Sequence, residues 1–336
     1  MTYKIKHNII FEEWSLFTES HPKSNIFQFP EMSEVYQKIK NYEPLFLAVT
    51  DEQENILGVL LAVIQKEHSG FLGKFSARSI IMGGPLVKKN NPEVLDFILA
   101  EYNKRVKGKA IYSQFRNQWE WNDAEKKIFN KHGFCYEPHL DIIHDLTSPV
   151  EKQFKALHKG RRKNIRRAER LNLVFREVKN RAEFTKAYEL VKSTYQKVRL
   201  PMPDKDYFSI AYDKLAQKDI FKTFVAVFNN QIIATRMVLC FNHSIYDWYA
   251  GASEKHLDKY PNDYLPWKIM QWGKNNGYKT FDFGGAGKPG EEYGVRDFKL
   301  KFGGELVNWG RFEKVHQPLM LQTGKVGFAL WKKLKL

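Results

Sequence analysis

The chain has 336 residues, of which 43% are hydrophobic and 15% aromatic, so it can bury the cores of two domains, and an intrinsically disordered chain is excluded. Lysine and arginine number 54 against 38 aspartate and glutamate residues, which gives a formal net charge of +16. This excess attracts any polyanion, whether a nucleic acid, an anionic membrane face or a phosphorylated substrate. It is equally compatible with a basic surface that only keeps the chain in solution.

The two cysteines, Cys135 and Cys240, lie far apart and have no metal-binding spacing, so neither a disulfide framework nor a structural zinc is expected. The polar N-terminus lacks the apolar stretch of a signal peptide. No run approaches the roughly 18 apolar residues of a spanning helix. The sequence therefore predicts a cytoplasmic protein, either free or peripheral at the inner membrane face, with no metal and no cofactor.

The first half of the chain predicts an antiparallel meander that leads into a crossover helix. Residues 45–49 and 56–63 are apolar runs on either side of a polar turn, typical of a β-hairpin. A strand over 77–82 follows, then a helix over 92–107 with apolar residues at helical spacing, and then a strand over 110–115.

The second half predicts the same elements in the same order, about 176 to 178 residues later. A hairpin is expected over 223–227 and 232–239, a third strand over 244–250, a helix over 263–276 and a strand over 278–283. Five elements repeated in order indicate a duplication.

Each half has the pattern of an acetyltransferase-like domain, so the predicted fold class is α/β (α+β). We expect two tandem domains with mixed, mostly antiparallel sheets and flanking helices. The N-terminal domain is placed at residues 1–147 and the C-terminal domain at 148–336. The second domain carries extra material at its front, beginning with a basic helix over 149–173.

The pyrophosphate loop of an acetyl-CoA enzyme is missing from the places where the pattern puts it. Such a loop has the form Gln/Arg-x-x-Gly-x-Gly/Ala and opens a helix, where backbone N–H groups meet phosphate. Residues 81–86 and 249–254 occupy these places and do not fit. Residues 105–110 match the letters but end a helix, where the dipole has the wrong sign. A standard acetyl-CoA enzyme is therefore disfavoured.

Residues 281–305 hold the most informative motif, Phe-Asp-Phe-Gly-Gly followed by Asp-Phe-Lys-Leu-Lys-Phe-Gly-Gly-Glu. Here a strand ends in Asp282 and the pair Gly284 and Gly285, which allow a ligand to approach the backbone closely. Sites in open α/β sheets gather at strand ends, and the loop that follows is long enough to line one. The motif predicts a ligand site.

This motif resembles the signature of the Fem family of non-ribosomal peptidyl transferases, and segments 26–31, 159–173, 249–253 and 266–272 add to the resemblance. It implies two acetyltransferase-like domains and an enzyme that moves an amino acid from aminoacyl-tRNA onto a side-chain amine of a lipid- or nucleotide-linked peptidoglycan precursor. A neighbouring branch of polysaccharide-associated acyltransferases shares the second-domain signature. The alternative is thus an acyl-CoA-dependent N- or O-acyltransferase of envelope polysaccharide or lipid synthesis. A third hypothesis is a non-catalytic protein that binds an anionic glycan or a nucleic acid.

Two residues are candidates for catalytic roles. By the resemblance Lys299, beside Phe298, would stabilise the tetrahedral oxyanion of acyl transfer, an effect of about 2.7–4 kcal/mol for one donor; its alternative is a solvated lysine on a helix face. Asp282 would bind or orient the nucleophilic amine; its alternative is to cap the Gly-Gly turn. No general base stands out, and substrate-assisted proton transfer would fit this gap.

Further residues are expected to bind substrate. For Tyr246 and Tyr249 the alternative is ordinary sheet packing, and for Arg236 it is solvent exposure. Those near the motif are Phe298, Arg296, Tyr249, Tyr246, Arg236, Gly284 and Gly285. Two more, Lys163 and Arg166, lie on the basic helix and would contact tRNA phosphates or a lipid-linked diphosphate. A charge run of this kind can also be a solvated face.

Two departures from the family pattern leave the acceptor and the donor open. The lysine that holds the pyrophosphate of soluble nucleotide precursors is replaced by Tyr36, with Lys38 two residues on. The coiled-coil arm of some members is missing. At the other end, residues 319–336 form a basic amphipathic segment that suits an anionic membrane surface, or a docking helix with a basic outer face.

Overall fold

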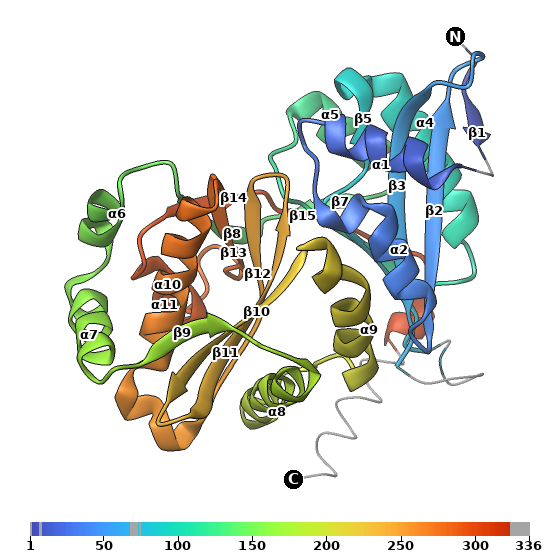
Figure 1. The fold of residues 1–336 in the computed structure, drawn as a ribbon. Coiled ribbons are helices and arrows are strands. Elements are labelled where there is room, and N and C mark those ends of the chain that lie inside the picture. The colour runs from blue at the N-terminus through green and yellow to red at the C-terminus, as the bar shows by residue number, and fades with distance from the viewer. Residues whose placement is uncertain (1, 7–8, 68–72, 74, 323–336) are drawn as a thin grey trace. The chain divides into compact units, whose positions relative to one another are not determined.

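The computed structural model describes residues 2–6, 9–67, 73 and 75–322, and these divide into two compact units, each built around one sheet (Figure 1). The first unit contains the chain up to Pro138 together with the segment from Trp309 onwards, and the second is His139–Asn308. Residues 323–336 of the predicted amphipathic segment lie outside the described residues. In the part of the chain that the structure describes, every helix is too short or too polar to cross a membrane.

The sheet of the first unit has a parallel pair at its centre and antiparallel pairs around it. In spatial order its strands are β1 (Lys4–Lys6), β2 (Tyr42–Thr50), β3 (Ile56–Gln65), β4 (Arg78–Met82), β6 (Tyr112–Arg116), β15 (Arg311–Val315) and β7 (Cys135–Glu137), with β5 (Leu86–Val87) paired to β3. The parallel pair is β4 and β6, which α4 (Pro92–Val106) connects.

The sheet of the second unit repeats this plan. Its spatial order is β14 (Glu305–Asn308), β8 (Leu140–Asp145), β13 (Thr280–Gly285), β12 (Ser244–Ala252), β11 (Gln231–Phe241), β10 (Phe221–Phe228) and β9 (Val174–Glu177). Strands β12 and β13 form the parallel pair, and α10 (Pro261–Asn275) connects them. The order β2-β3-β4-α4-β6 thus recurs as β10-β11-β12-α10-β13, which confirms the predicted tandem arrangement.

One strand of each sheet comes from the other half of the chain, and this differs from the expected division at residues 147 and 148. Strand β8 precedes that division but pairs with β13 in the second sheet. Strand β15 lies near the C-terminus but pairs with β6 and β7 in the first sheet. Each exchanged strand covers the edge that β6 or β13 would otherwise leave unpaired.

The remaining helices flank the two sheets. The first unit has α1 (Phe11–Ser20), α2 (Pro30–Gln37) and α5 (Asp123–Lys131). The second has α6 (Val150–Ala156), α7 (Lys159–Arg170), α8 (Arg181–Lys197), α9 (Lys205–Leu215) and α11 (Gly294–Leu300). The single helix expected over 149–173 is wrong, because the backbone is extended at Leu157 and His158, and the His158 ring caps α7 by accepting from the Gly160 N–H at 3.2 Å.

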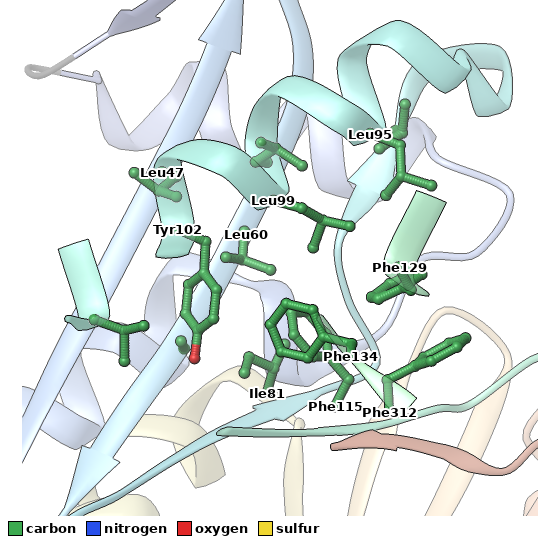
Figure 2. Close-up of a cluster of buried hydrophobic side chains, with 14 of the residues drawn as sticks. Leu47, Leu60, Ile81, Leu95, Leu99, Tyr102, Phe115, Phe129, Phe134 and Phe312 are labelled. Carbon is green, nitrogen blue, oxygen red and sulfur yellow. The ribbon is translucent and has the colours of Figure 1, made fainter. Parts of the chain in front are cut away.

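An aromatic core fills the first unit where β6 ends (Figure 2). The ring of Phe115 meets those of Phe129 and Phe134 edge-on at 5.2 and 5.1 Å. Phe312, from the exchanged strand β15, stacks on Phe129 at 3.9 Å. All four side chains are fully buried, so apolar packing stabilises the position of β15 in the first sheet.

Gln28 explains why the first unit needs the Gln-containing segment 26–31. Its fully buried amide donates to the carbonyls of Leu61 on β3 and Met82 on β4, and accepts from the Leu61 N–H at 2.7 Å. The two strands pair only over Val63–Gln65 and Arg78–Ile80. The side chain therefore substitutes for the ladder where β3 and β4 separate.

Candidate functional site

The second sheet opens between β12 and β13. The two strands pair in parallel at only three positions, the last of which joins Tyr246 to Asp282. Beyond it β12 bulges at Trp248, since Asp247 faces Val238 and Tyr249 faces Met237 on β11. Meanwhile β13 follows β8. An opening at the strand ends of a parallel pair is where α/β sheets bind ligands.

The end of β13 is held by Asp282 and Gly284. The Asp282 carboxylate accepts a hydrogen bond from the Gly284 N–H at 2.6 Å, which turns the chain. Gly284 has a φ of 69°, and a Cβ on it would lie 3.3 Å from the hydroxyl of Tyr246. Both the backbone conformation and the close tyrosine favour glycine here.

Lys299 points its ammonium from α11 back to this strand end. Its Nζ donates to three backbone carbonyls, those of Phe283, Gly284 and Gly285, at 2.6, 3.2 and 2.9 Å. An ammonium has three protons, so every one of them is directed at the end of β13. Burial lowers the pKa of Lys299, and the charges of Asp247 and Asp282 oppose that shift. A desolvated cation is thereby fixed at the opening.

Two carboxylates and an arginine share this environment. Burial raises the pKa of Asp282 to about 6, against the opposing effects of the Gly284 N–H and the Lys299 charge. Arg236 of β11 forms an ion pair with Asp247 of β12, and their side chains are only 8% and 7% exposed. Buried ionic groups of this kind are costly for stability and concentrate at functional sites.

Comparisons with known proteins agree with this geometry. The family model described as an acetyltransferase (GNAT) domain matches residues 157–299, which include α7 and end at Lys299. The UDP-N-acetylmuramoylpentapeptide-lysine N(6)-alanyltransferase of Weissella viridescens is 20% identical over 291 residues, 80% of this chain and 82% of that protein. The lipid II:glycine glycyltransferase of Staphylococcus haemolyticus is 32% identical over 112 residues, 31% of this chain and 27% of that protein.

The crystal structure of FemX matches with a TM-score of 0.76 at 17% identity, over 96% of this chain and the whole of that one, which shows a common fold. The chain is thus similar to Fem-family aminoacyltransferases, and its residues 157–299 match an acetyltransferase (GNAT) domain. These matches agree with the resemblance to the Fem family carried by residues 281–305. The roles of individual residues remain predictions, and the geometry of the chain bears on each of them.

Two predicted substrate-binding residues of the Fem signature have contacts within the protein. Arg296 donates to the carbonyls of Ala286 and Lys288 at 3.2 and 2.8 Å and also to that of Glu291, so it fixes the loop after β13. Phe298 lies under the guanidinium of Arg161 at 4.2 Å. These contacts position α11, which carries Lys299.

Tyr246 and Tyr249 occupy different surroundings. Tyr246 is the residue beside Asp282, with its hydroxyl near Gly284. Tyr249 follows the bulge, and its ring packs against Tyr195 of α8 at 5.4 Å and edge-on against Phe208 of α9 at 4.7 Å. The structure therefore brings Arg236, Tyr246, Asp282, Gly284, Gly285 and Lys299 together, while Tyr249 lies against α8 and α9.

Helix α7 presents a basic face that is distinct from the opening. An open hollow of about 820 Å³ is lined by Lys159, Arg162, Lys163, Arg166, Glu169 and Arg170. Glu169 is paired with Lys268 at 2.7 Å. Among the described residues no ion pair joins the five cations of this hollow to a carboxylate. The predicted residues Lys163 and Arg166 both belong to this surface, which we call the α7 basic face.

Sequence reasoning missed Asp247. Its signal is an acid within the strand run Tyr246-Asp247-Trp248-Tyr249, where an aromatic surface otherwise faces neighbouring helices. A charged residue at such a place needs a buried partner. Arg236, the sixth residue of β11, supplies it.

Proposed function

We propose that this chain is a Fem-type aminoacyltransferase that joins an amino acid to a side-chain amine of a peptidoglycan precursor, with aminoacyl-tRNA as the donor. The observation that carries the proposal is the desolvated ammonium of Lys299, fixed beside Asp282 at the opening between β12 and β13. The two relatives are named for alanyl transfer to a pentapeptide lysine and for glycyl transfer to lipid II. Both reactions form an amide on an amine.

In the proposed reaction the acceptor amine attacks the acyl carbonyl of the donor ester. A carbon–nitrogen bond forms, negative charge develops on the carbonyl oxygen, and the carbon–oxygen bond to the ribose breaks. Lys299 stabilises that charge, and its longest bond, 3.2 Å to the Gly284 carbonyl, is the one that the oxyanion would replace. The bound ammonium first releases one proton to solvent, which leaves the free amine that attacks. The second proton, lost as the carbon–nitrogen bond forms, passes to the departing ribose oxygen, so bond formation requires no protein base.

Asp282 holds the acceptor amine in this proposal. Its ionised form is the one that attracts an ammonium, and with a pKa of about 6 it is ionised at neutral pH. Gly284 and Gly285, the two glycines expected to bind substrate, lie at the same strand end, where Gly284 has a φ of 69°.

The α7 basic face binds the phosphates of the donor tRNA in the same proposal, through Lys163, Arg166 and their neighbours. A lipid-linked acceptor would bring the enzyme to the inner membrane face, where anionic headgroups or the precursor diphosphate would compete for these cations. The salt dependence of binding and the donor that supports transfer distinguish tRNA from a lipid headgroup or precursor diphosphate as the ligand of these cations.

Incubation of the purified chain with a precursor and either charged tRNA or acyl-CoA tests the proposal. We expect labelled amino acid to pass from charged tRNA to the precursor, and ribonuclease to abolish the transfer. Transfer that resists ribonuclease, or that uses acyl-CoA in its place, would contradict the tRNA donor and favour the acyl-thioester alternative.

A further inference from the structure

One carboxylate oxygen at the opening has no donor. The Oδ1 atom of Asp247 is buried, and within the described residues it accepts no hydrogen bond. Its Oδ2 atom is paired with Arg236. By contrast Lys299 uses all three protons, and Asp282 receives the Gly284 N–H. A buried acceptor that lacks a donor is destabilising. Its presence in a folded protein therefore indicates that a ligand supplies the donor.

Asp247 lies at the point where β12 leaves β13. Its backbone carbonyl is 3.7 Å from the position of a Cβ on Gly284, and the carbonyl of Gly284 accepts from Lys299 at 3.2 Å. The same glycine is thus flanked by Asp247 and by the Lys299 ammonium. Asp247 is therefore part of the opening that the proposed function uses.

Carboxylates outnumber cations among the charges that most affect Lys299. Besides burial, the charges that shift its pKa are those of Asp247, Asp282, Arg236 and Asp141. Together with Lys299 they make two cations and three carboxylates. Such an excess of carboxylates favours a cationic ligand.

Aromatic rings complete the surroundings. Burial and the charge of Asp247 raise the pKa of Tyr195 to about 12, so this ring is a neutral phenol at neutral pH. Tyr195 packs on Tyr249, which lies two residues beyond Asp247 in β12. A carboxylate beside tyrosine rings is the combination that binds ammonium groups, since the ring faces are electron-rich.

We propose that Asp247 Oδ1 binds the primary ammonium of a substrate, and that Arg236 holds the carboxylate in place for it. The inference rests on the proposed function, because the ammonium belongs either to the α-amino group of the donor's amino acid or to the amine of the acceptor. Both are the same chemical group. Asp247 thereby restricts substrates to those that carry a free ammonium.

Binding of small probes to the whole chain tests this without any transfer step, so a failure of the proposed function would not hide the result. Alaninamide and N-acetylalaninamide represent the donor with and without its charge. Nα-acetyllysine methylamide and its Nε-acetylated form represent the acceptor. We expect at least one ammonium probe to bind about tenfold or more tightly than its acetylated twin. The pair that shows the difference identifies the source of the ammonium.

The substitution Asp247→Asn should remove this difference, because the amide keeps the shape and loses the charge. Asp258→Asn, at an exposed aspartate of the same unit, is the matched control and should retain it. Equal binding of charged and acetylated probes by the wild-type chain would overturn the proposal, as would a preference that survives Asp247→Asn. If Asp247→Asn fails to fold, a wild-type structure with the probe decides: an ammonium nitrogen within hydrogen-bond distance of Oδ1 supports the site, and any other position refutes it.

Discussion

The ends of β6 and β13 occupy the same place in the two copies of the fold, and buried phenylalanine rings pack against both, which in the second unit are Phe281, Phe283 and Phe302. They differ in the charged groups at the strand end. In the first unit the region around β6 is filled by the rings of Phe115, Phe129 and Phe134, with Phe312 from the exchanged strand. In the second unit the region around β13 holds Asp282 and Lys299.

The strand pairs that precede these ends, β3 with β4 and β11 with β12, also differ in charge. In the first unit Gln28 bridges β3 and β4 with a neutral amide whose hydrogen bonds are all made to backbone. In the second unit the bulge of β12 presents Asp247 paired with Arg236. At this place the first unit thus uses a neutral amide that is fully hydrogen-bonded within the protein. The second unit retains buried charges, which are costly for stability and are typical of sites that react or bind a ligand.

The largest effect on stability is expected from a substitution in the aromatic core of the first unit. Phe129→Ala removes a ring that stacks on Phe312 and meets Phe115, and should lower the free energy of unfolding by about 3–5 kcal/mol. The rate of transfer by the folded fraction should not change. Denaturant unfolding measures the first quantity, and Leu16→Ala, at a side chain that is 66% exposed, is the control. A loss of rate with little loss of stability would break the comparison.

A substitution of Asp282 should have the opposite effect, with transfer lost and the free energy of unfolding raised. Its folded pKa of about 6 lies above the value near 3.9 of an unfolded aspartate, so the folded state holds the proton more tightly. Stability should therefore fall as the pH rises from about 4 to 6, and stay lowered above it. Asp282→Asn should abolish this slope and stabilise the protein at pH 8 by up to about 3 kcal/mol, while transfer falls.

Unfolding measured from pH 4 to 8 checks this prediction. Asp258→Asn is the control, because Lys259 lowers the pKa of Asp258 and the sign of its contribution is reversed. If Asp282→Asn were less stable than the wild type at pH 8, the carboxylate would be a structural cap of the Gly-Gly turn.

The smallest effect is expected at the α7 basic face. Lys163→Ala combined with Arg166→Ala should weaken tRNA binding and reduce the slope of log affinity against log salt by about 2, one for each phosphate contact. The unfolding free energy should stay the same. Filter binding at several salt concentrations measures the slope. Lys186→Ala with Lys205→Ala removes the same charge from α8 and α9 and should leave the slope unchanged; an equal loss in both pairs would mean a diffuse basic surface.

Local sequence patterns were sufficient for much of the fold. Apolar runs with polar turns predicted the strands within a few residues, and the repeat of five elements predicted the tandem domains. The exchange of β8 and β15 could not be predicted from local patterns. The strands with which they pair are roughly 140 and 195 residues away, and a strand's own sequence does not specify which sheet edge it pairs with. The break at Leu157 and His158 was also missed, since the flanking residues are good helix formers.

The site shows a similar division. The motif at residues 281–305 located the strand end, and the family resemblance pointed to Lys299 and Asp282. It did not reveal that Lys299 donates to three carbonyls, since this depends on how α11 turns back over β13. Nor did it reveal Asp247, whose importance follows from its buried pairing with Arg236 across two strands.

The most direct test of the account is the rate of transfer by Lys299→Ala compared with Lys301→Ala. Lys301 is an exposed lysine at the end of the same helix, so it controls for loss of charge. We expect kcat to fall by about 10²–10³-fold for Lys299→Ala and to stay at the wild-type value for Lys301→Ala, with both proteins folded by circular dichroism. Equal rates for the two folded variants would contradict the claim that the end of β13 is the site of acyl transfer.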